Sequence, residues 1–69
     1  MNPMFEELRE AIPQSNIFAH DCIRRADWFY AQGLPEQAAR TLYDLVVYGG
    51  LKTKEKLTVK STIVELRRV

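Results

Sequence analysis

The sequence lacks most of the devices that usually stabilise a very small protein. It has 69 residues and one cysteine, Cys22, so no disulfide can form within the chain. One histidine and one cysteine are also too few for a closed zinc site. A core of this size supplies only about 3–5 kcal/mol of net stability, so support from another chain is expected. We therefore expect one domain over residues 1–69 that associates with itself or with a protein partner.

Long hydrophobic runs are missing as well. No apolar stretch approaches the roughly 20 residues that a membrane-spanning helix needs, so no contact with a membrane is expected. Residues 1–7 are acidic and do not have the basic and then apolar pattern of a signal peptide. A cytoplasmic location is the resulting expectation, and a single thiol agrees with it.

Net charge is almost absent, at +1, but the charges are separated along the chain. Residues 1–21 carry four carboxylates against one arginine, whereas residues 49–69 carry six cations against two carboxylates. The acidic first part can contact the basic last part, a second copy of the chain, or another anionic molecule. A chain this close to neutral differs from most nucleic-acid-binding domains, which are strongly basic.

The spacing of the apolar residues predicts an all-α domain: a short N-terminal helix, a central helical hairpin and a basic C-terminal helix, four helices in total. In the short helix, Asn2 is expected as the N-cap and Pro3 as the first helical residue. Pro13 ends this helix, because the residue before a proline is driven out of the α region. A helix of about two turns is unstable alone, so we expect it to dock on another helix.

The central hairpin is the best-defined part of the pattern. Its first helix is expected to begin at an N-cap, Ser15 or Asn16, and to end at Gly33. Its second helix is expected to begin with Pro35 and to stop at the pair Gly49 and Gly50. The apolar stripe of the first helix, which we expect to be buried, contains Ile17, Ala19, Cys22, Ile23, Ala26, Phe29 and Tyr30.

Within residues 26–46 the hairpin resembles a tetratricopeptide repeat. Phe29 and Tyr30 match the aromatic pair of that family, and Gly33 matches its helix-breaking turn. Further matches to its small and apolar positions are Ala26, Ala38, Leu42 and Leu45. The resemblance implies a protein-binding module without catalytic activity.

Some positions depart from the family pattern. Cys22 stands where the family often has a large aromatic residue, and Gly50 stands where it often has proline. No second repeat is visible, although solenoids usually need about three to be stable. The same pattern also arises in any helical hairpin whose two helices cross closely.

The C-terminal segment allows two interpretations. Thr53 is expected to cap a helix that runs to about Arg67. The buried face of that helix is expected to contain Val59, Ile63 and Leu66, with Leu57 and Val64 beside it. Residues 56–64 also alternate and are rich in β-branched types, which is the pattern of a strand. A single strand would need a second copy as its partner, so we favour the helix.

Aromatic residues supply the first candidate surface. Trp28 lies beside Phe29 and Tyr30 but off the apolar stripe, so one of the three rings must point elsewhere. Aromatic residues with an arginine nearby are typical anchors of protein interfaces. The residues predicted to contact a protein are Trp28, Tyr30, Tyr43, Val47 and Tyr48. The alternative for Trp28 is that its ring covers the short N-terminal helix.

Basic residues supply the second candidate surface. The residues that would contact phosphates are Lys52, Lys54, Lys56, Lys60, Arg67 and Arg68. Residues 50–66 loosely resemble a helix-turn-helix reading frame. A small dimeric nucleic-acid-binding regulator that uses residues 52–68 is therefore the alternative function, although lysines after a glycine stop are ordinarily solvated.

No group of residues predicts catalysis or cofactor binding. His20 and Cys22 would point about 200° apart on a helix and cannot act on one metal or one substrate. Glu6 and Glu10 share a face, but no apolar cleft is predicted that would prepare them for acid–base catalysis. The sequence thus favours a non-enzymatic interaction protein, such as an adaptor, an inhibitor or a chaperone-like accessory factor. It predicts no cofactor, no metal and no small-molecule substrate.

Overall fold

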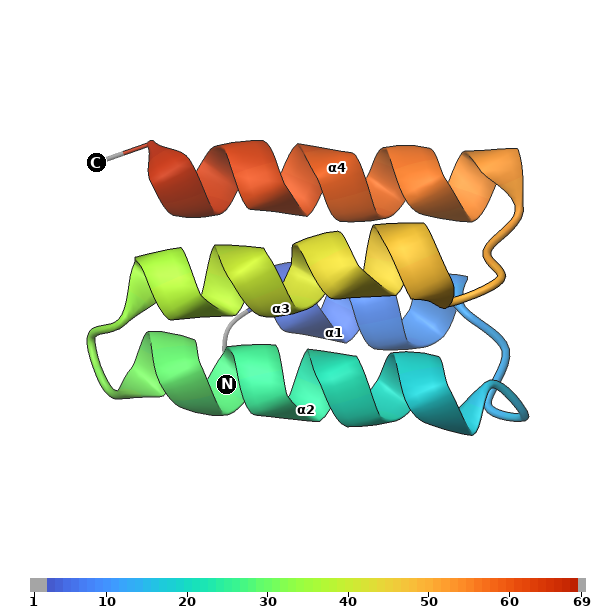
Figure 1. Ribbon diagram of the computed structural model, residues 1–69, viewed down its shortest axis with the longest axis horizontal. Coiled ribbons are helices and arrows are strands. Elements are labelled where there is room, and N and C mark those ends of the chain that lie inside the picture. The colour runs from blue at the N-terminus through green and yellow to red at the C-terminus, as the bar shows by residue number, and fades with distance from the viewer. Residues whose placement is uncertain (1–2, 69) are drawn as a thin grey trace.

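The computed structural model describes residues 3–68, which contain four α-helices and no strand (Figure 1). The helices are α1 (Pro3–Ala11), α2 (Ile17–Ala31), α3 (Pro35–Tyr48) and α4 (Thr53–Arg67). The expected all-α domain of a short helix, a hairpin and a C-terminal helix is thereby confirmed, and the strand alternative for residues 56–64 is not. The N-cap expected at Asn2 lies outside the described residues.

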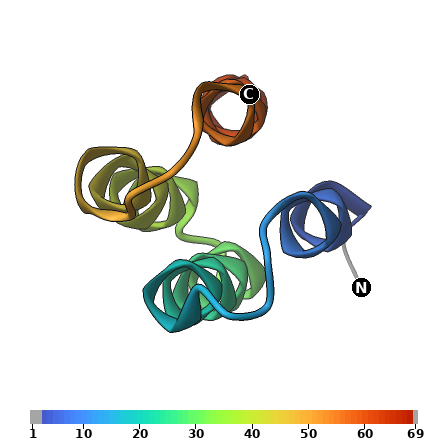
Figure 2. The ribbon, with the colours of Figure 1, turned by 90° about the vertical axis from the view of Figure 1, so that its right-hand side faces the viewer.

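The four helices form a ring in which each helix packs on two neighbours. Successive helices run in opposite directions, and a view along the bundle shows one helix at each corner (Figures 1 and 2). α1 and α3 each pack on both α2 and α4, and α3 makes the more extensive contacts. The acidic first helix consequently lies beside the basic last helix within one chain.

The turn between α2 and α3 follows from Gly33. This residue has a φ of +78°, which L-residues with a side chain rarely adopt. Its N–H donates to the Tyr30 carbonyl at 3.0 Å, and the N–H of Leu34 donates to the Phe29 carbonyl at 2.9 Å. These are the two hydrogen bonds of a Schellman motif. Pro35 then begins α3 as its first residue, as its fixed φ favours.

In the turn between α3 and α4, the N-cap of the last helix differs from the predicted one. The sequence predicted Thr53 as the N-cap of the last helix, but Thr53 is the first helical residue and Lys52 is the N-cap. The N–H of Lys52 donates to the Glu55 side chain at 3.0 Å. An acid at the third helical position can thus satisfy the backbone of the cap residue, whichever side chain the cap carries.

The core lies along the inside of the ring. Its buried apolar residues are Phe5, Leu8, Ile12, Ala19, Cys22, Ile23, Ala26, Ala38, Ala39, Leu42, Leu45, Leu51, Val59, Ile63 and Leu66. Three of these core residues are alanines of the central hairpin, Ala26 in α2 and Ala38 and Ala39 in α3, and all three are fully buried. Alanines allow two helix backbones to approach closely, which explains the extensive contact between these helices.

The stripe expected to be buried on α2 is wrong at its first residue, and its last residue, Tyr30, is also exposed, at 38%. Ile17, its first residue, is 80% exposed, because it lies on the outer side of the first turn. Leu57 and Val64 of α4, expected beside the buried face, are 61% and 60% exposed. The side chains of Ile17, Leu57 and Val64 point away from the core.

The short α1 is held by apolar and polar contacts together. Phe5 and Leu8 are fully buried, and the Phe5 ring lies 5.9 Å from the Tyr30 ring of α2. Arg9 donates to the Asp27 carboxylate of α2 at 2.7 Å. The expected docking of this helix on a neighbour is therefore present. No helix within residues 3–68 combines the length and the apolar character needed to cross a membrane.

Candidate protein-interaction surface

Four of the five residues predicted to contact a protein lie in three places, and the fifth, Tyr48, lies apart from them. Tyr43 and Val47 occupy the side of α3 that borders α4. Trp28 lies on the outer side of α2, and Tyr48 lies at the exposed end of α3. Tyr30 lines a groove between α1 and α4. The sequence identified these residues by type, and the ring of helices separates them.

The first surface combines exposed apolar side chains with cations. The guanidinium carbon of Arg67 lies 5.8 Å from the centre of the Tyr43 ring, which is a cation–π distance. This contact shows which side of α4 borders Tyr43. Val64 and Lys60 lie about one and two turns before Arg67 on that side, because residues three and seven positions apart share a helix face. Val47 follows Tyr43 by one turn on α3.

We call this surface the α3–α4 face. It consists of Tyr43, Val47, Lys56, Lys60, Val64 and Arg67, all of them exposed. Sequence reasoning missed Val64, which it assigned to the edge of the core. Val64 directly follows Ile63, and one step along a helix turns the side chain by about 100°. With Ile63 on the buried face, this spacing alone would have placed Val64 outside it.

The six cations predicted to contact phosphates do not share one face. Lys56, Lys60 and Arg67 belong to the α3–α4 face, but Lys54 lines the groove on the opposite side of α4. Arg68, at the end of the helix, pairs with Glu65 at 3.8 Å. Only half of the predicted phosphate contacts are therefore brought together.

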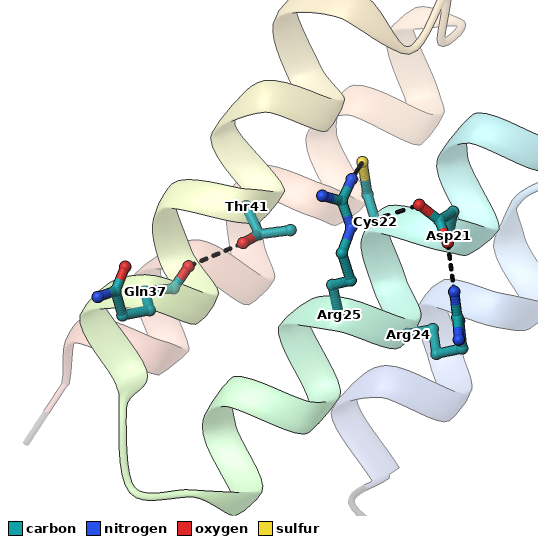
Figure 3. Close-up of polar contacts among 6 residues, drawn as sticks. All are labelled: Asp21, Cys22, Arg24, Arg25, Gln37 and Thr41. Atoms are coloured by element: carbon teal, nitrogen blue, oxygen red, sulfur yellow. Dashed lines mark hydrogen bonds and ion pairs between the residues drawn. The ribbon is translucent and has the colours of Figure 1, made fainter.

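The second surface is the outer side of α2, where Trp28 is 58% exposed. A shallow pocket lies beside its ring, lined by Arg24, Arg25 and Phe29. Asp21 accepts a hydrogen bond from Arg24 at 2.6 Å and forms an ion pair with Arg25 at 3.3 Å, and Arg25 also reaches the Cys22 sulfur (Figure 3). The hydrogen bond from Arg24 holds the pKa of Asp21 below its usual value. The one carboxylate of this surface is therefore shared by its two arginines.

The third place is the groove between α1 and α4, with a volume of about 750 Å³. Its lining includes Met4 and Glu7 from α1, Tyr30 from α2, and Thr58 and Glu65 from α4. The Thr58 hydroxyl donates to the Lys54 carbonyl of its own helix at 3.2 Å. The groove is open and mixes acids, a lysine and hydroxyl groups without a convergent set of donors.

His20 and Cys22 diverge, as their spacing on a helix requires. A nitrogen of the His20 ring lies 3.0 Å from the Ile12 carbonyl, on the side of α2 that faces the loop after α1. Cys22 is fully buried in the core, and this burial raises the pKa of its thiol. Within residues 3–68 no three His, Cys, Asp or Glu side chains are grouped as metal ligands.

Comparisons with protein-family models, curated proteins and solved structures found no match to this chain.

Proposed function

We propose that this chain is a small non-enzymatic protein-interaction module that binds another protein through its α3–α4 face. The observation that carries the proposal is the position of Arg67 over Tyr43, with the exposed Val47 and Val64 on the same side. Tyrosine and arginine are the residues that most often dominate binding energy at protein interfaces. Exposed aliphatic residues beside them supply area that a partner can remove from water.

The charge of this face selects the kind of partner. Its charged members, Lys56, Lys60 and Arg67, are all cations. A partner of opposite charge is attracted, and a like-charged one is repelled. An acidic amphipathic helix fits both features, because its apolar residues would contact Val47 and Val64 while its carboxylates meet the cations.

Nucleic-acid binding is the second candidate, and the grouping of Lys56, Lys60 and Arg67 on one side favours it. Phosphate recognition needs cations but gains little from aliphatic side chains between them. Val47 and Val64 lie among these cations, so the protein partner is the stronger proposal.

Two further statements belong to this proposal. A cytoplasmic location fits a chain with one cysteine, since that compartment keeps thiols reduced. The resemblance of residues 26–46 to a tetratricopeptide repeat stays a prediction, and it agrees with a role in protein binding.

The test uses fluorescence anisotropy with three labelled probes. They are an acidic amphipathic helical peptide, a peptide of the same composition in scrambled order, and a short DNA duplex. We expect the amphipathic peptide to bind best. Tyr43→Ser should weaken its binding by about tenfold or more, the scale of an interface anchor.

Tyr48→Ser is the matched control, because Tyr48 is an exposed tyrosine of the same helix outside the face. Tighter binding of the duplex, weakened by Lys60→Gln but not by Tyr43→Ser, would instead support the nucleic-acid candidate. Equal binding of both peptides, unchanged by Tyr43→Ser, would contradict the proposed protein-binding role of this face.

A further inference from the structure

The outer side of α2 carries four residues in a line. Ile17, Asp21, Arg24 and Trp28 are separated by four, three and four positions, the spacing of a coiled-coil seam. The buried residues of α2 lie on its other side, and in this line Ile17, Arg24 and Trp28 are exposed while Asp21 is half-buried. We call these four residues the α2 ridge.

The ridge has apolar ends and a charged centre. Ile17 and Trp28 expose 80% and 58% of their surface at the two ends. Asp21 and Arg24 lie between them and form an ion pair of 2.6 Å within the chain. The order along the helix is therefore apolar, acid, base, apolar.

This order is complementary to its own reverse. If a second α2 lies antiparallel across the first, with a two-fold axis passing between residues 22 and 23, each position i meets position 45 − i. Ile17 then meets Trp28 of the second copy, and Asp21 meets Arg24 of the second copy. A two-fold axis makes each of these contacts twice. We infer that the α2 ridge is the interface of an antiparallel homodimer of this chain.

The charges of the ridge favour an antiparallel second copy over a parallel one, and they favour the ridge over the α3–α4 face as the dimer interface. A parallel pair in register would place Asp21 against Asp21 and Arg24 against Arg24 of the second copy, and like charges repel. The α3–α4 face would likewise repel a copy of itself, because its charged residues are all cations. Of these two surfaces the balanced ridge is the one that suits self-association, and the proposed partner does not use it.

Size sets the expected strength. A standard interface covers about 800 Å² of each partner, which is roughly one sixth of this molecule's 4726 Å². A helix of 15 residues is about 22 Å long. The ridge and the residues beside it therefore bury less area than a standard interface does. Phe18, which directly follows Ile17, is also exposed. We expect a dissociation constant in the micromolar range.

Charge reversal provides the test, by sedimentation equilibrium on the full chain. Arg24→Asp gives a chain with two acids at the centre of the ridge, and Asp21→Arg gives a chain with two arginines there. Each variant alone should be monomeric, with dimerisation weakened at least tenfold. An equimolar mixture should recover a dimer, because acids of one chain then face arginines of the other at both central contacts. Far-UV circular dichroism confirms that both variants remain helical.

Two further variants locate the interface. Trp28→Ala should abolish the dimer, whereas Tyr43→Ser, on the α3–α4 face, should leave it intact. Trp28 is also the single tryptophan of the chain, so its emission should shift to shorter wavelength as protein concentration rises. A wild-type chain that stays monomeric up to about 1 mM, or a dimer that mixing the reversed variants does not restore, would overturn the inference. Neither result would affect peptide binding by the α3–α4 face.

Discussion

The residue whose environment is most constrained is Cys22. It lies in the core, and burial raises the pKa of its thiol although the Arg25 guanidinium, 3.7 Å from the sulfur, opposes the shift. A thiolate is the reactive form of cysteine, so a buried thiol that holds its proton is chemically inert. Cys22 therefore acts as a small apolar side chain of the core.

This raised pKa predicts how stability depends on pH. Above the ordinary thiol pKa of about 8.5, the unfolded chain loses the Cys22 proton while the folded chain keeps it. Proton release then favours unfolding, so the contribution of this group is present below that pH and is lost as pH rises toward the folded pKa. The slope reaches at most about 1.4 kcal/mol per pH unit.

Urea unfolding at several pH values measures this effect against Cys22→Ala as the control. The variant keeps every lysine and tyrosine, so their titration cancels in the difference between the two proteins. We expect the wild-type advantage in free energy of unfolding to shrink between about pH 8 and pH 10. A difference that stays constant over this range would show that the thiol titrates alike in both states.

Ile17 shows that the type and position of a residue in the sequence do not decide whether its side chain is buried. Its residue type and its spacing from Cys22 agreed with a buried stripe, yet its side chain is exposed. Seventeen and 22 are five positions apart, which is about 140° round a helix, so the two share a face only if that face is wide. The apolar arc of α2 is wide enough to suggest this, and only its neighbours decide which part of the arc is covered.

Among the elements, α1 depends most on specific side chains. It has nine residues, too few for a helix that is stable in isolation. Its contacts with α2 and α4 are less extensive than those of α3 with the same helices. The ion pair between Arg9 and Asp27 joins α1 to α2, and the two side chains are 30% and 26% exposed.

A double-mutant cycle on Arg9→Ala and Asp27→Ala tests that role. Partial burial limits screening by water, so we expect a coupling energy of about 1 kcal/mol, above the usual value for exposed pairs. The same cycle on Arg68→Ala and Glu65→Ala, an exposed ion pair at the end of α4 and outside the α2 ridge, is the control and should give a smaller coupling. Equal coupling in the two cycles would mean that the Arg9 pair does not hold α1.

The element boundaries were largely readable in advance, for identifiable reasons. Gly33, with its positive φ, and Pro35, with its fixed φ, act through their own backbone, so their effects do not depend on what surrounds them. The N-cap of α4 was misplaced by one residue, since Thr53 is a common cap type whereas Lys52 depends on the Glu55 side chain. Local sequence rules were enough to predict the helices. The start of α4 depends in addition on the hydrogen bond from the Lys52 N–H to the Glu55 side chain, three residues further on.

At the scale of the whole molecule, the ring of helices decides which surfaces exist. The sequence supplied the residue types of the candidate site but could not group them. Tyr43 and Trp28 were predicted together, and the bundle places one beside α4 and the other on the outer side of α2. This separation gives the molecule a cationic face suited to a different protein and a balanced ridge suited to a second copy.

The dimer inferred from the α2 ridge predicts that thermal stability depends on concentration. Association of folded chains removes them from the unfolding equilibrium, so more protein means a higher melting temperature. Above the dissociation constant, a tenfold rise in concentration is worth about 1.4 kcal/mol per mole of dimer, which corresponds to about 3–5 °C for chains of this length.

Melting followed by far-UV circular dichroism over a hundredfold concentration range measures this shift. Arg24→Asp alone should melt at one temperature throughout the range, because its ridge repels a second copy. An equimolar mixture of Arg24→Asp and Asp21→Arg should recover the dependence. A wild-type melting temperature that does not move with concentration would mean that the core of one chain is sufficient for stability, despite its 69 residues and its lack of a disulfide.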